Sequence, residues 1–195
     1  NGYSGGTTVS AGTLRVSAGD GLPDNGPVTL ANTVGVLLEV HGGTQFVGAL
    51  SGGGASGGNI TLANDARLAL SQTNTTTFAG TITGNGELTK GGTGTIVFTR
   101  QVAPANGINI AQGTLRLGAS NILDCAVQLG TSAAFDLNGN TETINGLSGQ
   151  GTVTLGSGAL TAAVDSSSTY AGVISGSGSL TKAGVAALTL SGNHT

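Results

Sequence analysis

The residues with the clearest potential for acid–base chemistry are Glu39 and His41, which stand two positions apart. A catalytic acid–base pair needs a pocket in which several polar groups converge on one point. Glu39 alternates with Leu38 and Val40, and alternation in a strand sends its side chain to the solvent side. We therefore predict that Glu39 and His41 are solvated surface residues.

Other polar residues stand in turn-like or glycine-rich stretches that predict exposed loops. Asp20 and Asp24 flank a Gly-Leu-Pro step, and a hard cation such as Ca²⁺ prefers several oxygen ligands in one loop. Two carboxylates are too few, so a turn rich in Asp, Asn, Gly and Pro is the favoured interpretation, and we predict no metal ion and no cofactor. The candidate binding residues of the exposed loops are Asp20, Asp24, Asn25, Asn59, Gln101 and Asn106.

The remaining reactive side chains have structural interpretations. Lys90 and Lys182 each follow a Leu-Thr pair, and we predict that both are solvated residues at strand ends. Cys125 has no second cysteine to pair with, so it is predicted to be a small packed residue at a turn that enters a strand. We predict no catalytic residue.

Glycine pairs and aromatic rings each recur in similar contexts. Residues 84–86 (GNG) and 176–178 (GSG) have the composition of phosphate-binding loops, but neither opens a helix, which is the element that binds anions. We expect turns that need positive φ. Tyr3, Phe78 and Tyr170 share an aromatic-small-Gly context and are predicted to pack at corners.

Composition and charge exclude several kinds of partner. The 195 residues include only 6 Lys and Arg, and the net charge is −3. No basic patch can neutralise a run of phosphates, so neither a nucleic acid nor an anionic membrane is a predicted partner. No stretch approaches the roughly 18 consecutive apolar residues of a membrane-spanning helix, so we expect a chain that is not embedded in a membrane.

The apolar residues of the sequence repeat with a period of two, and this period predicts that β-strands position the side chains described above. Glycine is abundant, at 37 residues, and such a chain is disordered unless it repeats. Apolar residues recur in pairs separated by one residue, which is strand spacing, with Gly, Asn, Ser and Thr between the pairs. Aromatic residues make up 3%, so the predicted core is narrow and aliphatic. Representative pairs are Leu38 with Val40, Ile60 with Leu62, Ile96 with Phe98, and Val153 with Leu155.

The chain also contains an internal duplication. Residues 12–16 (GTLRV) return as 113–117 (GTLRL), a shift of 101 from 12 to 113. Residues 84–90 (GNGELTK) return as 176–182 (GSGSLTK), a shift of 92 from 84 to 176. Order is kept, and the length differences fall between strands. The matches predict a single domain, 1–195, of two homologous halves at about 1–99 and 100–195.

Short similar strands favour one architecture. A strand of three residues cannot bury its apolar face alone and needs a like neighbour above and below it. Stacking in parallel gives an all-β solenoid, and with roughly 20 to 30 residues per coil the chain makes about seven to nine coils.

Two stretches carry a resemblance to a known family. Residues 176–182 followed by 188–193 (LTLSGN) resemble the first half of the autotransporter-associated β-strand repeat, and residues 1–14 (NGYSGGTTVSAGTL) resemble its second half. The resemblance implies a right-handed parallel β-helix in the passenger of a type V secretion system, exported through the periplasm and outer membrane to the bacterial surface. It also implies a segment cut from a longer array, with flanking repeats of the same chain as partners.

The function expected from this resemblance is a structural stalk of a secreted surface adhesin, without enzymatic activity. Self-association and a host-cell or glycan receptor are further expected partners. One alternative is a polysaccharide lyase or hydrolase, since β-helices often carry such sites. Another is direct glycan or cell adhesion through the loops at 18–26, 52–59 and 101–107.

Overall fold

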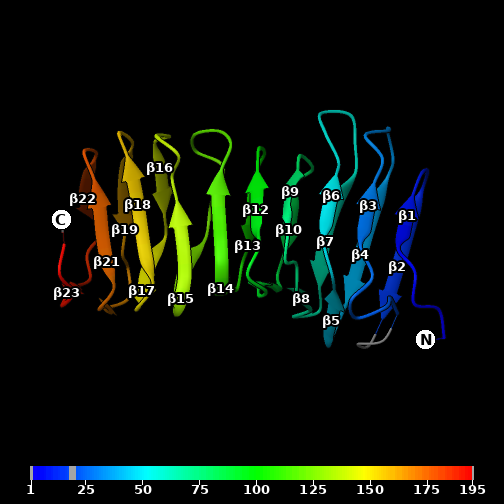
Figure 1. The fold of residues 1–195 in the computed structure, drawn as a ribbon, viewed down its shortest axis with the longest axis horizontal. Helices are drawn as coiled ribbons and strands as arrows, with labels where there is room; N and C mark the ends of the chain where they lie inside the picture. Colours follow the sequence, from blue (N-terminus) through cyan, green and yellow to red (C-terminus); the bar gives the residue numbers. More distant parts are fainter. Residues whose placement is uncertain (1, 18–20, 195) are drawn as a thin grey trace.

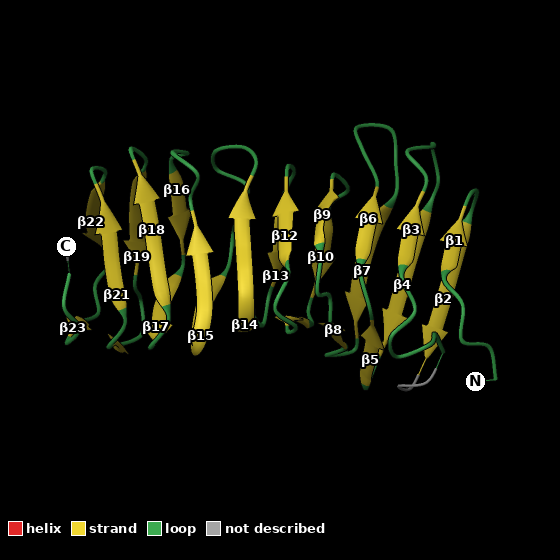
Figure 2. Ribbon diagram, viewed as in Figure 1, coloured by secondary structure: helices red, strands yellow, loops and turns green. Residues whose placement is uncertain are grey.

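The computed structural model describes residues 2–17 and 21–194, which form 23 β-strands and no helix. The strands wind around one axis, and about nine coils stack along it from the N-terminus to the C-terminus (Figure 1). Strands and short connections alternate throughout (Figure 2). The described residues thus include no apolar helix long enough to cross a membrane. The prediction of an all-β solenoid of seven to nine coils is confirmed.

Each coil offers three strand positions, which form three faces. The strands of the first face alternate buried apolar residues with outward polar ones, as the period of two requires. Along the axis they are β1 (Thr7–Val9), β3 (Val28–Leu30), β6 (Leu50–Gly52), β9 (Thr75–Phe78), β12 (Thr95–Phe98), the second parts of β14 (Ile108–Leu117) and β15 (Ala126–Asp136), β18 (Thr152–Gly156) and β21 (Val173–Gly176).

The third face joins the first in one 15-stranded sheet, because β14 and β15 run around the corner between the two faces without a break. A single long strand therefore serves two positions. The third face comprises β5 (Thr44–Val47), β8 (Arg67–Leu70), β11 (Glu87–Lys90), the first parts of β14 and β15, β17 (Gly146–Gly149), β20 (Ser168–Tyr170) and β23 (Leu188–Leu190).

The second face is interrupted between a five-stranded and a three-stranded sheet. At coil six, which runs from the second part of β14 to the first part of β15, only an isolated bridge, Val102 to Leu123, continues it. Its strands are β2 (Thr13–Ser17), β4 (Leu37–His41), β7 (Asn59–Ala63), β10 (Ile82–Gly84), β13 (Val102–Pro104), β16 (Glu142–Ile144), β19 (Ala159–Ala163) and β22 (Ser179–Ala183).

All strand pairs of the described residues are parallel, and the register continues from coil to coil apart from shifts between Ile110 and Gln112 and between Thr154 and Gly156. Register partners on successive coils lie between 18 residues apart, from Ala134 to Thr152, and 26 apart, from Gly52 to Phe78. Because like positions stack, each inward residue sits in a column. The core is consequently continuous through the coils. One such column is Leu38, Ile60, Ile82 and Val102, all at most 1% exposed.

Of the three aromatic residues predicted to pack at corners, Phe78 and Tyr170 are buried, whereas the prediction is wrong for Tyr3, which is 44% exposed. Phe78 and Phe98 are stacked register partners with ring centroids 6.4 Å apart in an edge-to-face arrangement, and both are buried. Gly84 and Gly176 have φ of 112° and 121°, so the glycine pairs are turns that an L-residue would strain. A narrow, mainly aliphatic core is confirmed.

The duplicated segments do not lie on the same face. Residues 12–16 enter β2, in the second position of coil one, whereas residues 113–117 form the second part of β14, in the first position of coil six. The other matched strands are displaced equally: β9 to β20, β11 to β22 and β12 to β23. The displacement is fourteen strand positions, and with three positions per coil this equals four and two-thirds turns. Division into two homologous halves stays a prediction.

Candidate functional site

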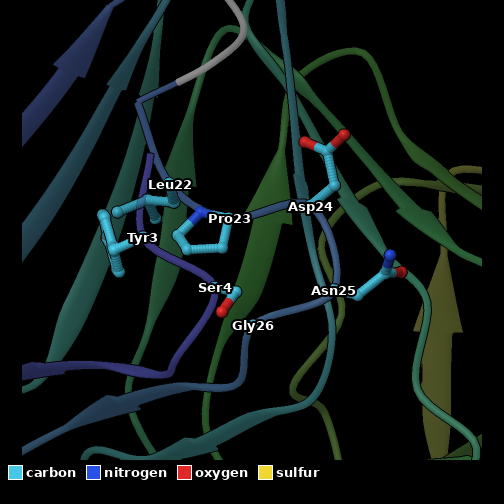
Figure 3. Close-up of a pocket in the computed structure, with 7 residues that line it drawn as sticks. All are labelled: Tyr3, Ser4, Leu22, Pro23, Asp24, Asn25 and Gly26. Carbon is cyan, nitrogen blue, oxygen red and sulfur yellow. The ribbon is translucent and has the colours of Figure 1, made fainter. Parts of the chain in front are cut away.

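The predicted binding loop near the N-terminus lines an open cavity of about 280 Å³. Figure 3 shows Tyr3 and Pro23 on one side of this loop, with the exposed side chains of Asp24 and Asn25 on the other. Asp20 lies outside the described residues. Among the described residues that line the cavity, Asp24 contributes the single carboxylate, and Tyr3 shares a 2.7 Å hydrogen bond between its hydroxyl and Thr7 Oγ1. These described lining residues can donate and accept hydrogen bonds, and by themselves they hold fewer oxygen charges than a calcium loop.

The other predicted loop residues lie on different coils, and the structure does not bring them together. Asn59 begins β7 and is half-buried, and its Oδ1 accepts a 3.0 Å hydrogen bond from the Thr81 amide on the next coil. This hydrogen bond therefore links the coil of Asn59 to the next coil. Gln101 is exposed just before β13. Asn106 is exposed at the corner that leads into β14, where its Nδ2 donates to the Asn85 carbonyl at 2.8 Å.

Asn106 also borders the first of two adjoining hollows on the third face. The first, about 190 Å³, lies over β14 and β15, and the second, about 590 Å³, lies over β15 and β17; both are bordered by Ala126 and Ser148. Their floor is shallow because Gly107, Ala126 and Gly146 have little or no side chain. The hydrogen-bonding side chains around them are those of Glu87, Asn106, Asn109, Gln128, Asn145, Ser148, Asp165, Ser166, Ser167 and Ser168.

These groups form an ordered row and not a random scatter. Asn109, Gln128 and Ser148 are register partners on three successive coils, so they point outward one above the other at the strand spacing of about 4.8 Å. The described residues of this lining supply amides, hydroxyls and two carboxylates, Glu87 and Asp165, and include no Lys or Arg. It suits an extended ligand rich in hydroxyl groups better than an anionic one.

Glu39 and His41 are part of a surface ion pair that links coils one and two. Arg15 Nε donates to Glu39 Oε2 at 2.6 Å, and His41 Nε2 lies 3.8 Å from the same oxygen. The histidine Nδ1 faces the Asn64 amide at 3.4 Å. Glu39 and His41 are partly exposed on an open face, so the prediction that they are surface residues is confirmed.

Two further ion pairs join register partners on the outside of the solenoid. Arg116 Nε donates to Asp136 Oδ2 at 2.7 Å, and these residues are the duplicates of Arg15 and Glu39. Arg67 Nε lies 3.2 Å from Glu87 Oε1. Each pair connects one coil to the next, and this placement indicates a structural role.

The prediction that Lys90 is solvated is wrong. Lys90 is 0% exposed, in an inward column between Leu70 and Ile110, and its Nζ donates to the carbonyls of Gly91, Gly92 and Gln112 at 2.7, 2.8 and 3.1 Å. Burial lowers the pKa of this ammonium to about 8. The alternation of inward and outward residues in the sequence did indicate this burial. Lys90 stands two positions after the inward Leu88, whereas Thr89 between them points outward.

Lys182 is exposed, as predicted, yet its Nζ is bonded in the same way. It donates to the carbonyls of Ala183 at 2.6 Å and Gly184 at 2.9 Å, the counterparts of Gly91 and Gly92. Both lysines therefore donate hydrogen bonds to the backbone carbonyls of the corner that follows them.

Glu142 is a second buried charge that the sequence did not single out. Its carboxylate, 0% exposed, accepts 2.9 and 3.0 Å hydrogen bonds from the amides of Ile122 and Thr143. Burial raises its pKa, against the opposing effect of these backbone donors. Since the second face has no strand at coil six, the carboxylate serves as the acceptor that a neighbouring strand would provide.

Cys125 is buried near this break, as predicted for a small packed residue. Burial, with the nearby charges of Asp124 and Glu142, raises the pKa of its thiol to about 12. A thiol with this pKa holds little of the thiolate form, which is the nucleophile, at neutral pH. Among residues 2–17 and 21–194, no three His, Cys, Asp or Glu side chains gather in a way that could hold a metal ion.

Comparison with known proteins gives one partial relative. No family model and no solved structure matches the chain. The Adhesin BmaC autotransporter of Brucella suis biovar 1 (strain 1330) is 46% identical over 57 residues, which are 29% of this chain and 2% of that protein. The chain therefore spans a small fraction of the length of the relative. Part of this β-solenoid is similar to an autotransporter adhesin.

Proposed function

We propose that this chain is a structural segment of the passenger of a secreted bacterial surface adhesin of the autotransporter type. The observation that carries the proposal is the stack of about nine parallel coils with a continuous core. The partial match to an autotransporter adhesin supports the same assignment. The segment acts mechanically, as a stalk that holds a distal binding region away from the cell, and it has no enzymatic role.

The architecture explains how such a stalk is built and exported. At about 4.8 Å per coil, nine coils make a rod of roughly 40 Å. Contacts run between neighbouring coils, so each coil folds on the one before it without an external energy source. We further propose that other coils of the same polypeptide flank the segment, and that it reaches the cell surface through the periplasm and outer membrane.

Deleting coils in the parent adhesin tests the role. Thr75 and Thr95 are register partners, so removing residues 75–94 excises one whole coil and keeps the phase of the stack. Removing only residues 75–86 deletes β9 and β10 and breaks the phase. We expect the phase-breaking deletion to reduce surface display strongly and the whole-coil deletion to preserve it, as measured by antibody labelling of intact cells.

Removal of the entire segment is expected to lower display while leaving the ligand specificity of distal regions intact. Unchanged display after both the full and the phase-breaking deletions would contradict the structural role. Release of reducing sugars from pectin-like or host glycans by the purified segment would contradict the absence of enzymatic activity.

A second candidate, direct adhesion to glycans, is favoured by the hollows of the third face. The row formed by Asn109, Gln128 and Ser148 offers amide and hydroxyl groups along a shallow surface. Glycan-array binding that is lost in the Asn109→Ala, Gln128→Ala double variant would support it. The matched control replaces Asp24 and Asn25 by alanine, because loss of binding there would assign adhesion to the N-terminal loop.

A further inference from the structure

The hollows of the third face lie on the side of the solenoid, over β14, β15 and β17. On this face each of these strands pairs with a neighbour on both sides, so none of them is an end of the stack. Figure 1 shows β14 and β15 side by side near the middle of the long axis. Further coils at either end of the chain would lengthen the stack and leave this surface open.

The two hollows adjoin and form one trough along the solenoid axis, over coils five to seven. Its floor is a column of positions in which the side chain is a methyl group or absent, namely Gly107, Ala126 and Gly146. One wall stands two residues further along each strand, where the row of Asn109, Gln128 and Ser148 points outward. The trough is therefore a channel with one ordered polar side.

Larger side chains border the trough on its remaining sides. Asn106 at coil five and Asn145 at coil seven stand at the corner before the floor. Glu87 borders the end in coil four, and its Oε1 lies 3.2 Å from Arg67 Nε. Residues 165–168 border the opposite end in coil eight. Three coils at about 4.8 Å each leave a channel roughly 14 Å long.

The polar groups of the wall are not used by hydrogen bonds within the protein. Elsewhere on the outside, stacked hydroxyl groups bond to each other, as Thr29 Oγ1 and Ser51 Oγ do at 3.1 Å. Among the residues that the structure describes, no such bond joins Asn109, Gln128 and Ser148, although they are register partners. A side-chain amide or hydroxyl can both donate and accept. The wall thus offers paired donors and acceptors to a ligand.

The surroundings of the trough exclude other kinds of ligand. Because its strands are already paired on both sides, an extended peptide cannot add to them as a further strand. None of the large apolar side chains exposed on the described residues lines the trough, so it lacks the anchors of a protein interface. The carboxylates of Glu87 and Asp165, at its two ends, repel an anionic chain. An uncharged chain of hydroxyl groups remains.

We propose that the trough binds a neutral, unbranched oligosaccharide of about three sugar units, with its chain along the solenoid axis. The spacing of the coils is close to the length that one pyranose ring adds to an extended glycan, so each coil faces one ring. Asn109, Gln128 and Ser148 each bond to the hydroxyl groups of one ring, and the bare floor admits the rings. The proposal deepens the second candidate function, direct adhesion to glycans, and rests on it; it does not depend on the stalk role.

Titration of the purified chain with oligosaccharides of one to six units tests the class and length of the ligand. The neutral probes are cello-oligosaccharides and oligomers of N-acetylglucosamine, and the anionic probe is a series of oligogalacturonides. Chemical-shift changes in NMR spectra report binding. We expect the affinity for a neutral probe to rise with each unit up to three and then to stay constant. Oligogalacturonides of the same length should bind about tenfold or more weakly, because each ring carries a carboxylate.

Filling the floor tests the place of binding. Ala126 is exposed, so Ala126→Leu should leave the midpoint of thermal unfolding unchanged while its side chain occupies the middle of the trough. We expect the affinity for the neutral trimer to fall about tenfold or more. Ala134→Leu makes the same change on the first face of the same strand, β15, and should have no effect. Gln128→Ala should lower the affinity about fivefold, the factor expected for loss of one hydrogen bond.

The outcomes separate this proposal from the functions proposed above. Tight binding of an anionic glycan that is lost in the Asn109→Ala, Gln128→Ala double variant would keep the adhesion candidate and overturn the neutral ligand. Affinity that continues to rise beyond three units, or that Ala126→Leu leaves unchanged, would overturn the placement in the trough. The absence of binding to both neutral series overturns the proposal, whereas the stalk role is measured by surface display of the parent adhesin and stands apart from these titrations.

Discussion

The corner after Lys90 and the corner after Lys182 have nearly the same sequence and different surroundings. Both lysines donate to the two carbonyls that follow their strand, but only Lys90 has a third acceptor, supplied by the next coil. Lys90 is fully buried and Lys182 is exposed. In this solenoid a residue is therefore buried by the coil stacked on it as much as by its own coil.

The comparison of Lys90 with Lys182 places the stabilising contacts between neighbouring coils. This agrees with repeat proteins in general, in which each repeat contacts only its neighbours. Substitutions of matched residues should accordingly cost much more inside the stack than at coil nine. The following experiments compare an inner position with its counterpart at an end, beginning with the largest expected difference.

Replacing each lysine by alanine should give the largest contrast. Lys90→Ala leaves the carbonyls of Gly91, Gly92 and Gln112 unpaired in the interior and removes a buried stem, so we expect a loss of about 3 to 4 kcal/mol in the free energy of unfolding. Lys182→Ala should change it by about 0.5 kcal/mol or less, as for a surface substitution. Urea unfolding of the two variants is the measurement, and equal losses would contradict the comparison.

Two glycines that are not duplicates of each other, one inside the stack and one at its end, each lie against a backbone carbonyl of the preceding coil. A Cβ added at Gly80 would collide with the Gly58 carbonyl oxygen, and one added at Gly192 would collide with the Gly172 oxygen. Gly80→Ala should cost about 2 to 3 kcal/mol, because coils lie on both sides of it. Gly192→Ala should cost under about 1 kcal/mol, since the last coil can shift. The midpoint of thermal unfolding followed by circular dichroism would report both, and a larger loss at Gly192 would count against the argument.

The pH dependence of the free energy of unfolding should contain a contribution that comes from Lys90. Its pKa is lowered to about 8 in the folded state, so between pH 8 and about 10.5 the unfolded chain binds the extra proton and stability rises with pH. We expect a gain of about 1 to 2 kcal/mol between pH 8 and 10 relative to Lys90→Met. Taking the difference between wild type and variant removes the opposing contribution of Cys125, whose pKa is raised to about 12. A difference that stays flat over this range would refute the assignment.

The surface ion pairs should show the smallest contrast. Arg116 with Asp136 lies inside the stack and Arg15 with Glu39 lies near its N-terminal end, and both arginines are well exposed. Double-mutant cycles should give about 0.5 kcal/mol for each pair, because neither depends on a covering coil. A coupling several times larger for the inner pair would show that burial also strengthens these contacts.

Most of the fold was predictable from the period of two. The alternation in segments such as Leu38 to Val40 marks the inward side of a strand, and the brevity of each strand requires stacking. The lack of aromatic residues correctly predicted a narrow core. The burial of Lys90 was missed because a charge was assigned to solvent by residue type, although its place in the alternation pointed inward.

The candidate sites were less predictable, because they depend on the spacing between coils. Gln101 and Asn59 lie on different coils and do not converge, whereas Asn109, Gln128 and Ser148 form a row that no local motif announces. The row arises because residues about 20 positions apart in the sequence are register partners on successive coils. The carboxylate of Glu142 likewise has a role only because coil six lacks a strand on the second face.

The sequence by itself determined the strands, their inward residues and the turns, because period, residue size and glycine conformation are local properties. It also determined that the corner after Lys90 returns after Lys182. Only the tertiary structure decided which face each copy occupies, since the duplicates are four and two-thirds turns apart and loop lengths set that fraction. Burial of each lysine was decided there too, because a neighbouring coil excludes water from Lys90, whereas the described residues place no further coil on Lys182.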